Sequence, residues 1–173
     1  MPSLNGSGPS CGHGLRTSTT VALRFDDLGP LGHVNNVASL RIVEESRRAV
    51  LGRPAAAGLN GAGLLTSLDD SLQHVVRRQL LEYNAELWFA AAPLTVRHRV
   101  AGVGTTSFVL SSGVYAPMSG TAAVRAEATI VLIDAEARTA RPLPDDLRAI
   151  LSCRCWQPDT GEDSAPLGMS NRC

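Results

Sequence analysis

The sequence predicts an α+β domain in which a curved antiparallel sheet wraps around one long central helix. One helical stretch, residues 37–52, carries apolar side chains over most of its circumference, a distribution typical of a helix that is buried on most sides. Four stretches of strand-like composition follow it. A strongly curved antiparallel sheet is the simplest structure that covers such a helix.

The first elements are a strand, a loop and the long helix. The stretch "TTVALRF" (19–25) alternates well enough for a strand, and the loop "DDLGPLGHVNN" (26–36) separates it from the helix. Asn36 is a suitable N-cap for this helix, and Gly52, which is followed by "RP", ends it. The loop therefore leads directly into the first turn of the helix.

The rest of the domain is β in character until its last turns. The last strand holds a near-continuous apolar run from Thr129 to Ile133, as expected for a strand buried on both faces. A short closing helix follows, with Asp145 and Asp146 in its first turn. The four strands and the closing helix are predicted at 72–89, 94–104, 106–117, 121–134 and 141–152. This order of elements is the outline of the hotdog fold.

One domain is expected, because 173 residues with 44% hydrophobic content suit a single core. Residues 1–17 and 153–173 are polar and aperiodic and are predicted to be flexible tails around a domain at 18–152. All four cysteines lie in these tails, at Cys11, Cys153, Cys155 and Cys173. Their spacing does not favour a metal site or a disulfide framework.

The charge and hydropathy of the chain exclude some classes of partner. The formal net charge is +0 and all 16 basic residues are arginines, so no excess of positive charge attracts nucleic acid. No apolar run approaches the ~18 residues that a membrane helix needs, and the N-terminus has no signal-peptide core. We therefore expect a protein of the cytoplasm without membrane insertion.

Specific residues also point to a known family. The stretch "LRFDDLGPLGHVNNVASLRIVEESR" resembles the acyl-CoA thioesterases of the hotdog superfamily, specifically the 4-hydroxybenzoyl-CoA thioesterase-like group. The matching residues are the segment Gly32 to Asn36, and Leu40, Arg41, Glu44 and Arg47 on the helix. The resemblance continues at Tyr83, at the turn with Gly104 and Ser107, and in the ending "RPLPDDLRAIL". In all, the resemblance covers about 135 of the 173 residues.

Three positions depart from the family pattern. Gly29 stands where the family has its second aspartate, which is usually the catalytic acid. Ser39 replaces a tyrosine of the helix, and Glu86 replaces the proline of a Tyr-x-x-Pro segment on the long strand. The first departure bears on catalysis directly.

The resemblance implies hydrolysis of an acyl-CoA or acyl-carrier-protein thioester to a free acid and a thiol, without a cofactor. It also implies a homodimer or homotetramer, because sites of this superfamily generally lie between subunits. The alternative, favoured by Gly29, is a protein that binds an acyl thioester without hydrolysing it. A hydratase is disfavoured because no His-x-x-x-x-Pro-Gly segment is present.

The candidate site residues lie mostly in the loop. Thioester hydrolysis needs an activated water and donors for the developing oxyanion, and a helix N-terminus offers such donors. We expect catalytic roles for Asp27, His33 and Asn35, and substrate contacts from Gly32, Val34, Asn36, Glu44 and Ser107. Structural alternatives are a solvated Asp27, a loop-bonded His33, capping by the two asparagines, an ion pair of Glu44 with Arg41 or Arg48, and an unused Ser107.

Overall fold

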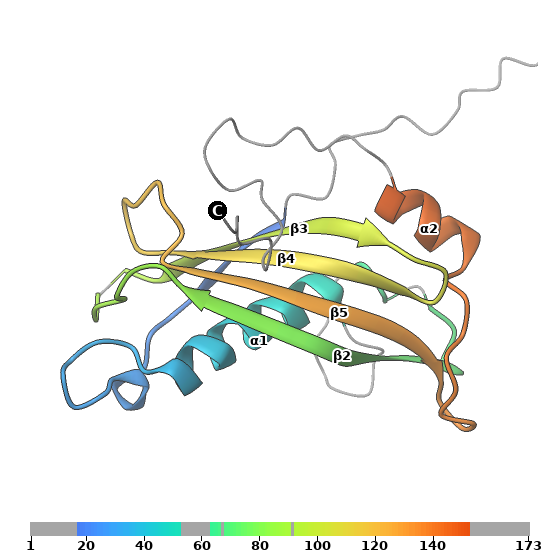
Figure 1. Cartoon of the computed structure of the whole chain (residues 1–173), viewed down its shortest axis with the longest axis horizontal. Helices are drawn as coiled ribbons and strands as arrows, with labels where there is room; N and C mark the ends of the chain where they lie inside the picture. The colour runs from blue at the N-terminus through green and yellow to red at the C-terminus, as the bar shows by residue number, and fades with distance from the viewer. Residues whose placement is uncertain (1–16, 53–62, 67, 91, 153–173) are drawn as a thin grey trace, which may run out of the picture.

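The computed structural model describes residues 17–52, 63–66, 68–90 and 92–152, which form one antiparallel sheet and two α-helices (Figure 1). The four cysteines, nearly all of the predicted N-terminal tail and the whole predicted C-terminal tail lie outside these residues. The α+β class, the antiparallel sheet and the closing helix are confirmed.

The elements follow the predicted order along the chain. They are β1 (Thr17–Val21), the 3-10 helix η1 (Phe25–Asp27), α1 (Asn36–Leu51), β2 (Leu72–Tyr83), β3 (Leu94–Val103), β4 (Ser107–Tyr115), β5 (Val124–Asp134) and α2 (Asp145–Ser152). The 5-stranded sheet has the order β1-β3-β4-β5-β2, and every neighbouring pair is antiparallel. Strands β1 and β2 are therefore its two edges.

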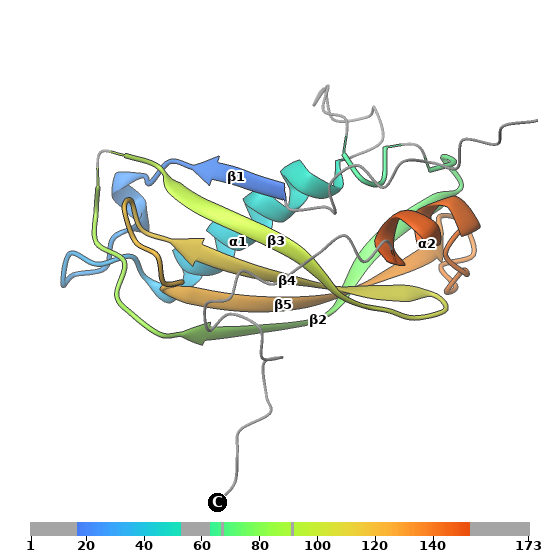
Figure 2. The ribbon, with the colours of Figure 1, turned by 90° about the horizontal axis from the view of Figure 1, so that it is seen from above.

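Helix α1 lies along one face of the twisted sheet, and α2 covers the far end of the strands (Figures 1 and 2). The sequence predicted a sheet wrapped around one long central helix, and this is not confirmed, because α1 is buried on one side only. Its buried stripe includes Ile42, Val43 and Ser46, whereas Val37 is 78% exposed. One sheet of this size covers one side of the helix and leaves the other open.

Two strand boundaries differ from the prediction. The predicted strand 19–25 begins two residues earlier and ends at Val21, where β1 pairs with Leu94, the first residue of β3. The predicted strand 72–89 ends at Tyr83. After β1 the chain leaves the sheet to build the loop that precedes α1, and after β2 it leaves the sheet to run beside this loop, where Leu87 O accepts from Val34 N–H.

The interior consists of two apolar clusters with a polar seam between them. The first cluster joins the N-terminal half of α1 to the sheet and includes Ile42, Val96 and Val114. The second joins the C-terminal end of α1 to α2 and includes Leu51, Phe108, Leu110, Leu143, Leu147 and Leu151. The register His98↔Ser112 places the polar seam between these two clusters.

The polar seam is a hydrogen-bonded chain through a buried histidine. Ser46 Oγ of α1 lies 2.6 Å from His98 Nε2, and Ser112 Oγ lies 2.8 Å from His98 Nδ1. The hydroxyl of Thr19 extends the chain to β1 by bonding to Ser46. Burial, and then the positive charge of Arg47, lower the pKa of His98 from 6.5 to about 4, so the imidazole is neutral at neutral pH.

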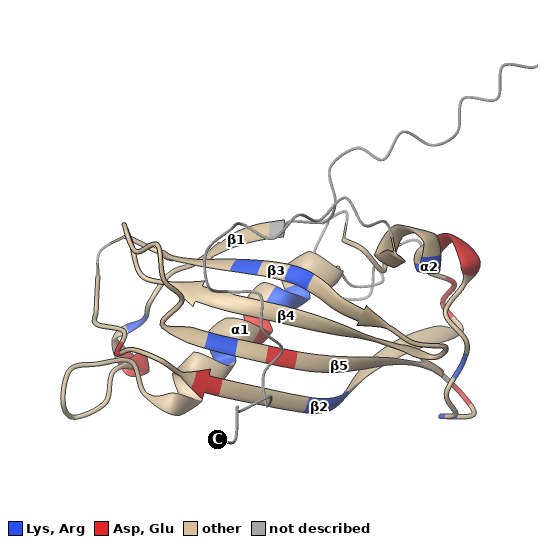
Figure 3. Ribbon diagram, turned by 45° about the horizontal axis from the view of Figure 1, so that its top comes forward, with Lys and Arg blue, Asp and Glu red and all other residues tan. Residues whose placement is uncertain are grey.

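Charges of both signs are distributed over strands β2, β3 and β5 (Figure 3). This distribution fits the zero net charge, although the exclusion of nucleic acid stays a prediction. Neither helix of the described residues is long and apolar enough to span a bilayer.

Candidate active site

The loop between β1 and α1 folds as two successive turns. After η1, an antiparallel bridge joins Leu28 to Val34 around the β-turn Gly29–Gly32, in which Gly32 N–H donates to Gly29 O at 2.9 Å. Pro30 occupies the second position of this turn, where its fixed φ is favourable. Gly32 has φ +82, a conformation that glycine adopts at little cost.

Asp27 connects this loop to α1. Its carboxylate is buried and accepts two hydrogen bonds from Arg41, one from Nη2 at 2.6 Å and one from Nε at 3.1 Å. The backbone N–H of Arg24 donates to the same carboxylate at 2.7 Å. A carboxylate bound in two places by a guanidinium is a strong structural contact, and both oxygens of Asp27 are occupied by it.

Asn35, and not Asn36, is the N-cap of α1. Its Oδ1 accepts from Ala38 N–H at 2.8 Å, and its Nδ2 donates to Asp27 O at 3.1 Å. Asn36 is the first residue of the helix. The prediction was wrong by one position because both residues are good caps and the conformation of the loop selects between them.

The first turn of α1 leaves two backbone donors available. Among the described residues, the N–H groups of Asn36 and Val37 have no hydrogen-bond acceptor. A helix of 16 residues also places the positive end of its dipole at this turn. The junction predicted to receive a carbonyl oxygen therefore has suitable donors.

Two hollows open on either side of the loop. The inner hollow, ≈ 320 Å³, lies between the first turn of α1 and residues 83–87, with buried Val34, Leu87 and Val124 in its lining. The outer hollow, ≈ 760 Å³, lies between the loop and α1 and is lined by the Asp27–Arg41 pair among others. His33 and Asn36 line both hollows.

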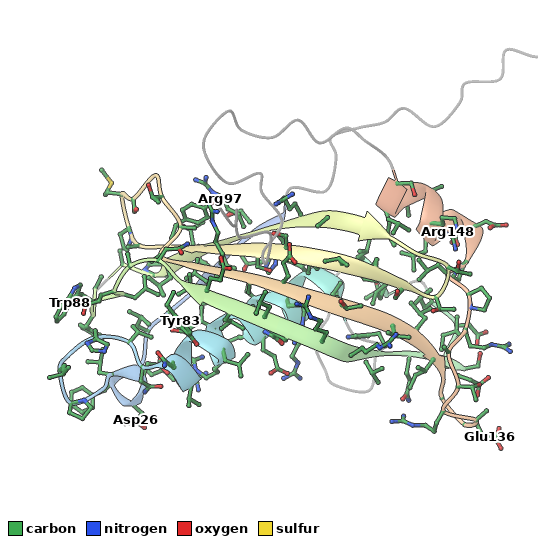
Figure 4. The ribbon with its side chains drawn as sticks, in the orientation of Figure 1. Asp26, Tyr83, Trp88, Arg97, Glu136 and Arg148 are labelled. Atoms are coloured by element: carbon green, nitrogen blue, oxygen red, sulfur yellow. The ribbon has the colours of Figure 1, made fainter. Side chains whose placement is uncertain are left out.

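His33 is held in place by the segment that follows β2. An isolated antiparallel bridge joins it to Trp88, and the two rings meet edge to face with centroids 6.0 Å apart. Tyr83, at the end of β2, donates from its hydroxyl to Asn36 O at 3.4 Å. In Figure 4, Tyr83 and Trp88 lie at the loop end of the molecule.

The remaining predicted site residues lie in different places. Val34 is buried in the core beside the inner hollow. Glu44 is exposed on α1, and Arg41 pairs with Asp27 and Glu45 instead. Ser107 pairs with Val131 at the opposite end of the sheet, so one chain does not bring it to the loop.

Sequence reasoning missed Glu86 as a site residue. It lines the inner hollow together with Asn36 of the first turn of α1. The sequence signal that could have identified Glu86 was its unusual place, since a carboxylate stands where the family has a proline.

Within the described parts of the chain, no three histidine, cysteine, aspartate or glutamate side chains lie close enough together to hold a metal ion.

Comparison with known proteins identifies the family. The family model of the thioesterase-like superfamily matches residues 23–151. The chain belongs to this superfamily. None of the curated proteins matches the chain by sequence.

Solved structures of the superfamily share the fold. A probable thioesterase of Escherichia coli, YbaW, is 24% identical with a TM-score of 0.63, covering 79% of this chain and 96% of its own. A thioesterase of Thermus thermophilus, solved with coenzyme A and Zn, is 27% identical with a TM-score of 0.59, covering 78% and 90%. A 1,4-dihydroxy-2-naphthoyl-CoA thioesterase of Synechocystis is 14% identical with a TM-score of 0.61, covering 79% and 95%.

Proposed function

We propose that this thioesterase-superfamily protein hydrolyses an acyl thioester of coenzyme A, or of an acyl carrier protein, to a free acid and a thiol. The observation that carries the proposal is the inner hollow, whose lining includes Asn36 with its available N–H group. A thioester carbonyl bound there would develop its negative charge against this donor and the helix dipole. The coenzyme A bound to the Thermus thermophilus thioesterase supports this substrate class.

The predicted site residues divide into two roles in this proposal. His33 and Asn36 line the hollows and contact the substrate, and Gly32 gives the turn that presents His33. Asp27 and Asn35 act as positioning residues, because their side chains are engaged with Arg41 and with the helix backbone. Contacts of Glu44 and Ser107 with substrate stay predictions, and a second subunit would have to bring Ser107 near.

A second candidate function is binding of an acyl thioester without hydrolysis. Two observations favour it: Gly29 carries no acid, and the carboxylate of Asp27 is held by Arg41. Release of free thiol from acetyl-, octanoyl-, palmitoyl- and benzoyl-CoA distinguishes the two functions. Hydrolysis predicts turnover of at least one of them, whereas saturable binding of all four without thiol release supports the second function.

The Gly29→Asp variant sharpens this test. A Cβ at Gly29 would lie 3.6 Å from His33 O and 3.8 Å from Asn35 Cβ, both ordinary contacts, so the first side-chain atom fits without moving the loop. Gly29 lines the outer hollow and not the inner one, so we expect thiol release to keep the wild-type rate. A rise of about tenfold would instead place the reacting carbonyl in the outer hollow, since a positioned acid or base contributes ~10²–10⁴-fold when its geometry is ideal. Gly120→Asp, on an exposed turn with nothing near its Cβ, is the matched control and should leave the rate unchanged.

We also propose that the protein is a homodimer or homotetramer in the cytoplasm. Strand β2 is a 12-residue edge, whose unpaired backbone groups favour addition of a second sheet. Val37 is 78% exposed and Leu40 39% on the uncovered side of α1, as expected for a subunit contact. Light scattering tests the assembly: a Val37→Asp chain should have the mass of a smaller assembly than wild type, and a monomeric wild type contradicts it.

A further inference from the structure

Hydrolysis at the loop requires a group that takes a proton from water, and three carboxylates line the two hollows. They are Asp26 and Asp27 on η1, and Glu86 in the segment after β2. Asp27 is engaged on both oxygens with Arg41 and Arg24, as described above. The choice therefore lies between Asp26 in the outer hollow and Glu86 in the inner hollow.

The two hollows differ in what surrounds a bound carbonyl. The inner hollow reaches buried apolar side chains of Val34, Leu87 and Val124, which exclude water from one side of a ligand. The lining of the outer hollow includes the Asp27–Arg41 ion pair, and Asp26 is exposed at its edge. Oriented hydrogen-bond donors stabilise transition-state charge more strongly where buried side chains exclude water. This difference favours the inner hollow.

The backbone pairing after β2 places Glu86 diagonally across from His33. Val34 N–H donates to Leu87 O at 2.7 Å, beside the antiparallel bridge of His33 to Trp88. Val34 and Leu87 are buried, so the alternate positions His33 and Glu86 fall on the other side of this ribbon. Both residues line the inner hollow.

The spacing that this geometry implies leaves room for a reacting group. Diagonal neighbours on antiparallel segments are roughly 7–8 Å apart between Cα atoms. A water molecule and a thioester carbonyl fit between side chains at that separation. Moreover, the carboxylate of Glu86 has no ion pair or hydrogen bond among the described residues, so it is available as a proton acceptor.

We infer that Glu86 is the general base of this site, replacing the acid that Gly29 lacks; the inference rests on the proposed hydrolysis. The carboxylate takes a proton from water while the water oxygen forms a bond to the thioester carbon. The carbonyl electron pair moves onto oxygen, toward the N–H group of Asn36, which lines the inner hollow. When the pair returns, the carbon–sulfur bond breaks, and the thiolate takes the proton from Glu86.

Three variants test this inference with the four acyl-CoA substrates named above. Glu86→Gln keeps the size of the side chain and removes the base, so kcat should fall at least about 100-fold with KM nearly unchanged. Glu86→Asp should recover part of the lost rate. Glu136→Gln is the matched control at the opposite end of the molecule (Figure 4), and it should keep the wild-type rate.

The outcomes separate this inference from the proposed function. If the wild type releases thiol and Glu86→Gln keeps its kcat within threefold, Glu86 is not the base, although hydrolysis stands. If Asp26→Asn loses the rate instead, the base belongs to the outer hollow and the inference is overturned. If the wild type turns over none of the four substrates, both the function and the inference fail. Circular dichroism of each variant confirms that a lost rate is not lost folding.

Discussion

The two ends of the molecule differ in how completely their groups are satisfied. At the α2 end, Leu147 and Leu151 join Leu51 in a closed apolar cluster. The guanidinium of Arg148 donates to Gly104 O and Thr105 O, both at 2.9 Å, and so fastens the turn between β3 and β4. Among the described residues, the apolar side chains of this cluster and the carbonyl groups of this turn already have partners within the chain.

At the loop end, apolar side chains and backbone donors stay exposed. Phe25 is 83% exposed, and Leu31, Trp88 and Phe89 are each more than half exposed. The first N–H groups of α1 lack acceptors among the described residues. The contrast indicates that the α2 end of the sheet stabilises the fold, whereas the loop end has groups free to contact a ligand or a second subunit.

The largest expected effect is that of a core substitution at the α2 end. Leu147→Ala should lower the free energy of unfolding by about 3 kcal/mol, because Leu147 is 3% exposed and its removal leaves a cavity. Trp88→Ala at the loop end is the counterpart and should cost less than about 1 kcal/mol, since the ring is 55% exposed. Urea unfolding measures both.

Thiol release should respond in the opposite order. The rate per folded molecule should be unchanged in Leu147→Ala and reduced in Trp88→Ala, because Trp88 supports the ring of His33. An equal stability loss in the two variants would remove the distinction between the two ends.

A smaller effect concerns the contact that gives the loop its shape. Asp27→Asn removes the charge that pairs with Arg41 and should lower the free energy of unfolding by about 2–3 kcal/mol. The value lies at the low end for buried pairs because Arg41 keeps Glu45 and is partly exposed. Asp26→Asn, one residue away and exposed, should change stability by less than about 0.5 kcal/mol. Similar unfolding curves for the two variants would contradict a structural role for Asp27.

The polar seam between the ends should make stability depend on pH. The folded protein keeps His98 neutral down to a pKa of about 4, whereas an unfolded chain protonates it below 6.5. Unfolding therefore takes up a proton in this range, and stability falls as the pH falls from about 6.5 to about 4. The loss between pH 7 and pH 5 should be about 2 kcal/mol.

Comparison with His98→Gln isolates this effect. The variant will be less stable at pH 7, but its stability should fall less than that of the wild type between pH 7 and pH 5. Ser112→Ala, which keeps the histidine, should retain the full pH dependence. Parallel curves for wild type and His98→Gln would show that another group is responsible.

The sequence predicted the elements best where local pattern decides the structure. The strands β3, β4 and β5 and the helix α2 lie within a few residues of their predicted limits, because alternation and helix signals are local. The end of β1 was missed because pairing with Leu94 stops at Val21, which no feature of "ALRF" indicates. The exposed side of α1 was missed because burial depends on how far one sheet extends.

The sequence predicted where the loop leads into α1 better than it predicted what each side chain of the loop contacts. The segment Gly32–Asn36 marked the loop correctly as the entrance to α1. The ion pair of Asp27 with Arg41 depends on the folded positions of η1 and α1, so it could not be predicted from the sequence. Asp27 was therefore predicted to be a catalytic residue. The sequence showed Glu86 only as a departure from the Tyr-x-x-Pro pattern of the family. It comes near His33 because the chain after β2 runs back beside the loop in the folded protein.

The contact between Asp27 and Arg41 also bears on the order in which the chain folds. These residues are only 14 positions apart, whereas the strands that complete the sheet join residues much farther apart in the chain. Contacts between near positions cost less loop-closure entropy and form sooner. We expect the loop to take its shape together with α1, before β2 pairs with β5. Refolding rates of the Asp27→Asn variant test this order, since an early contact slows refolding when it is removed.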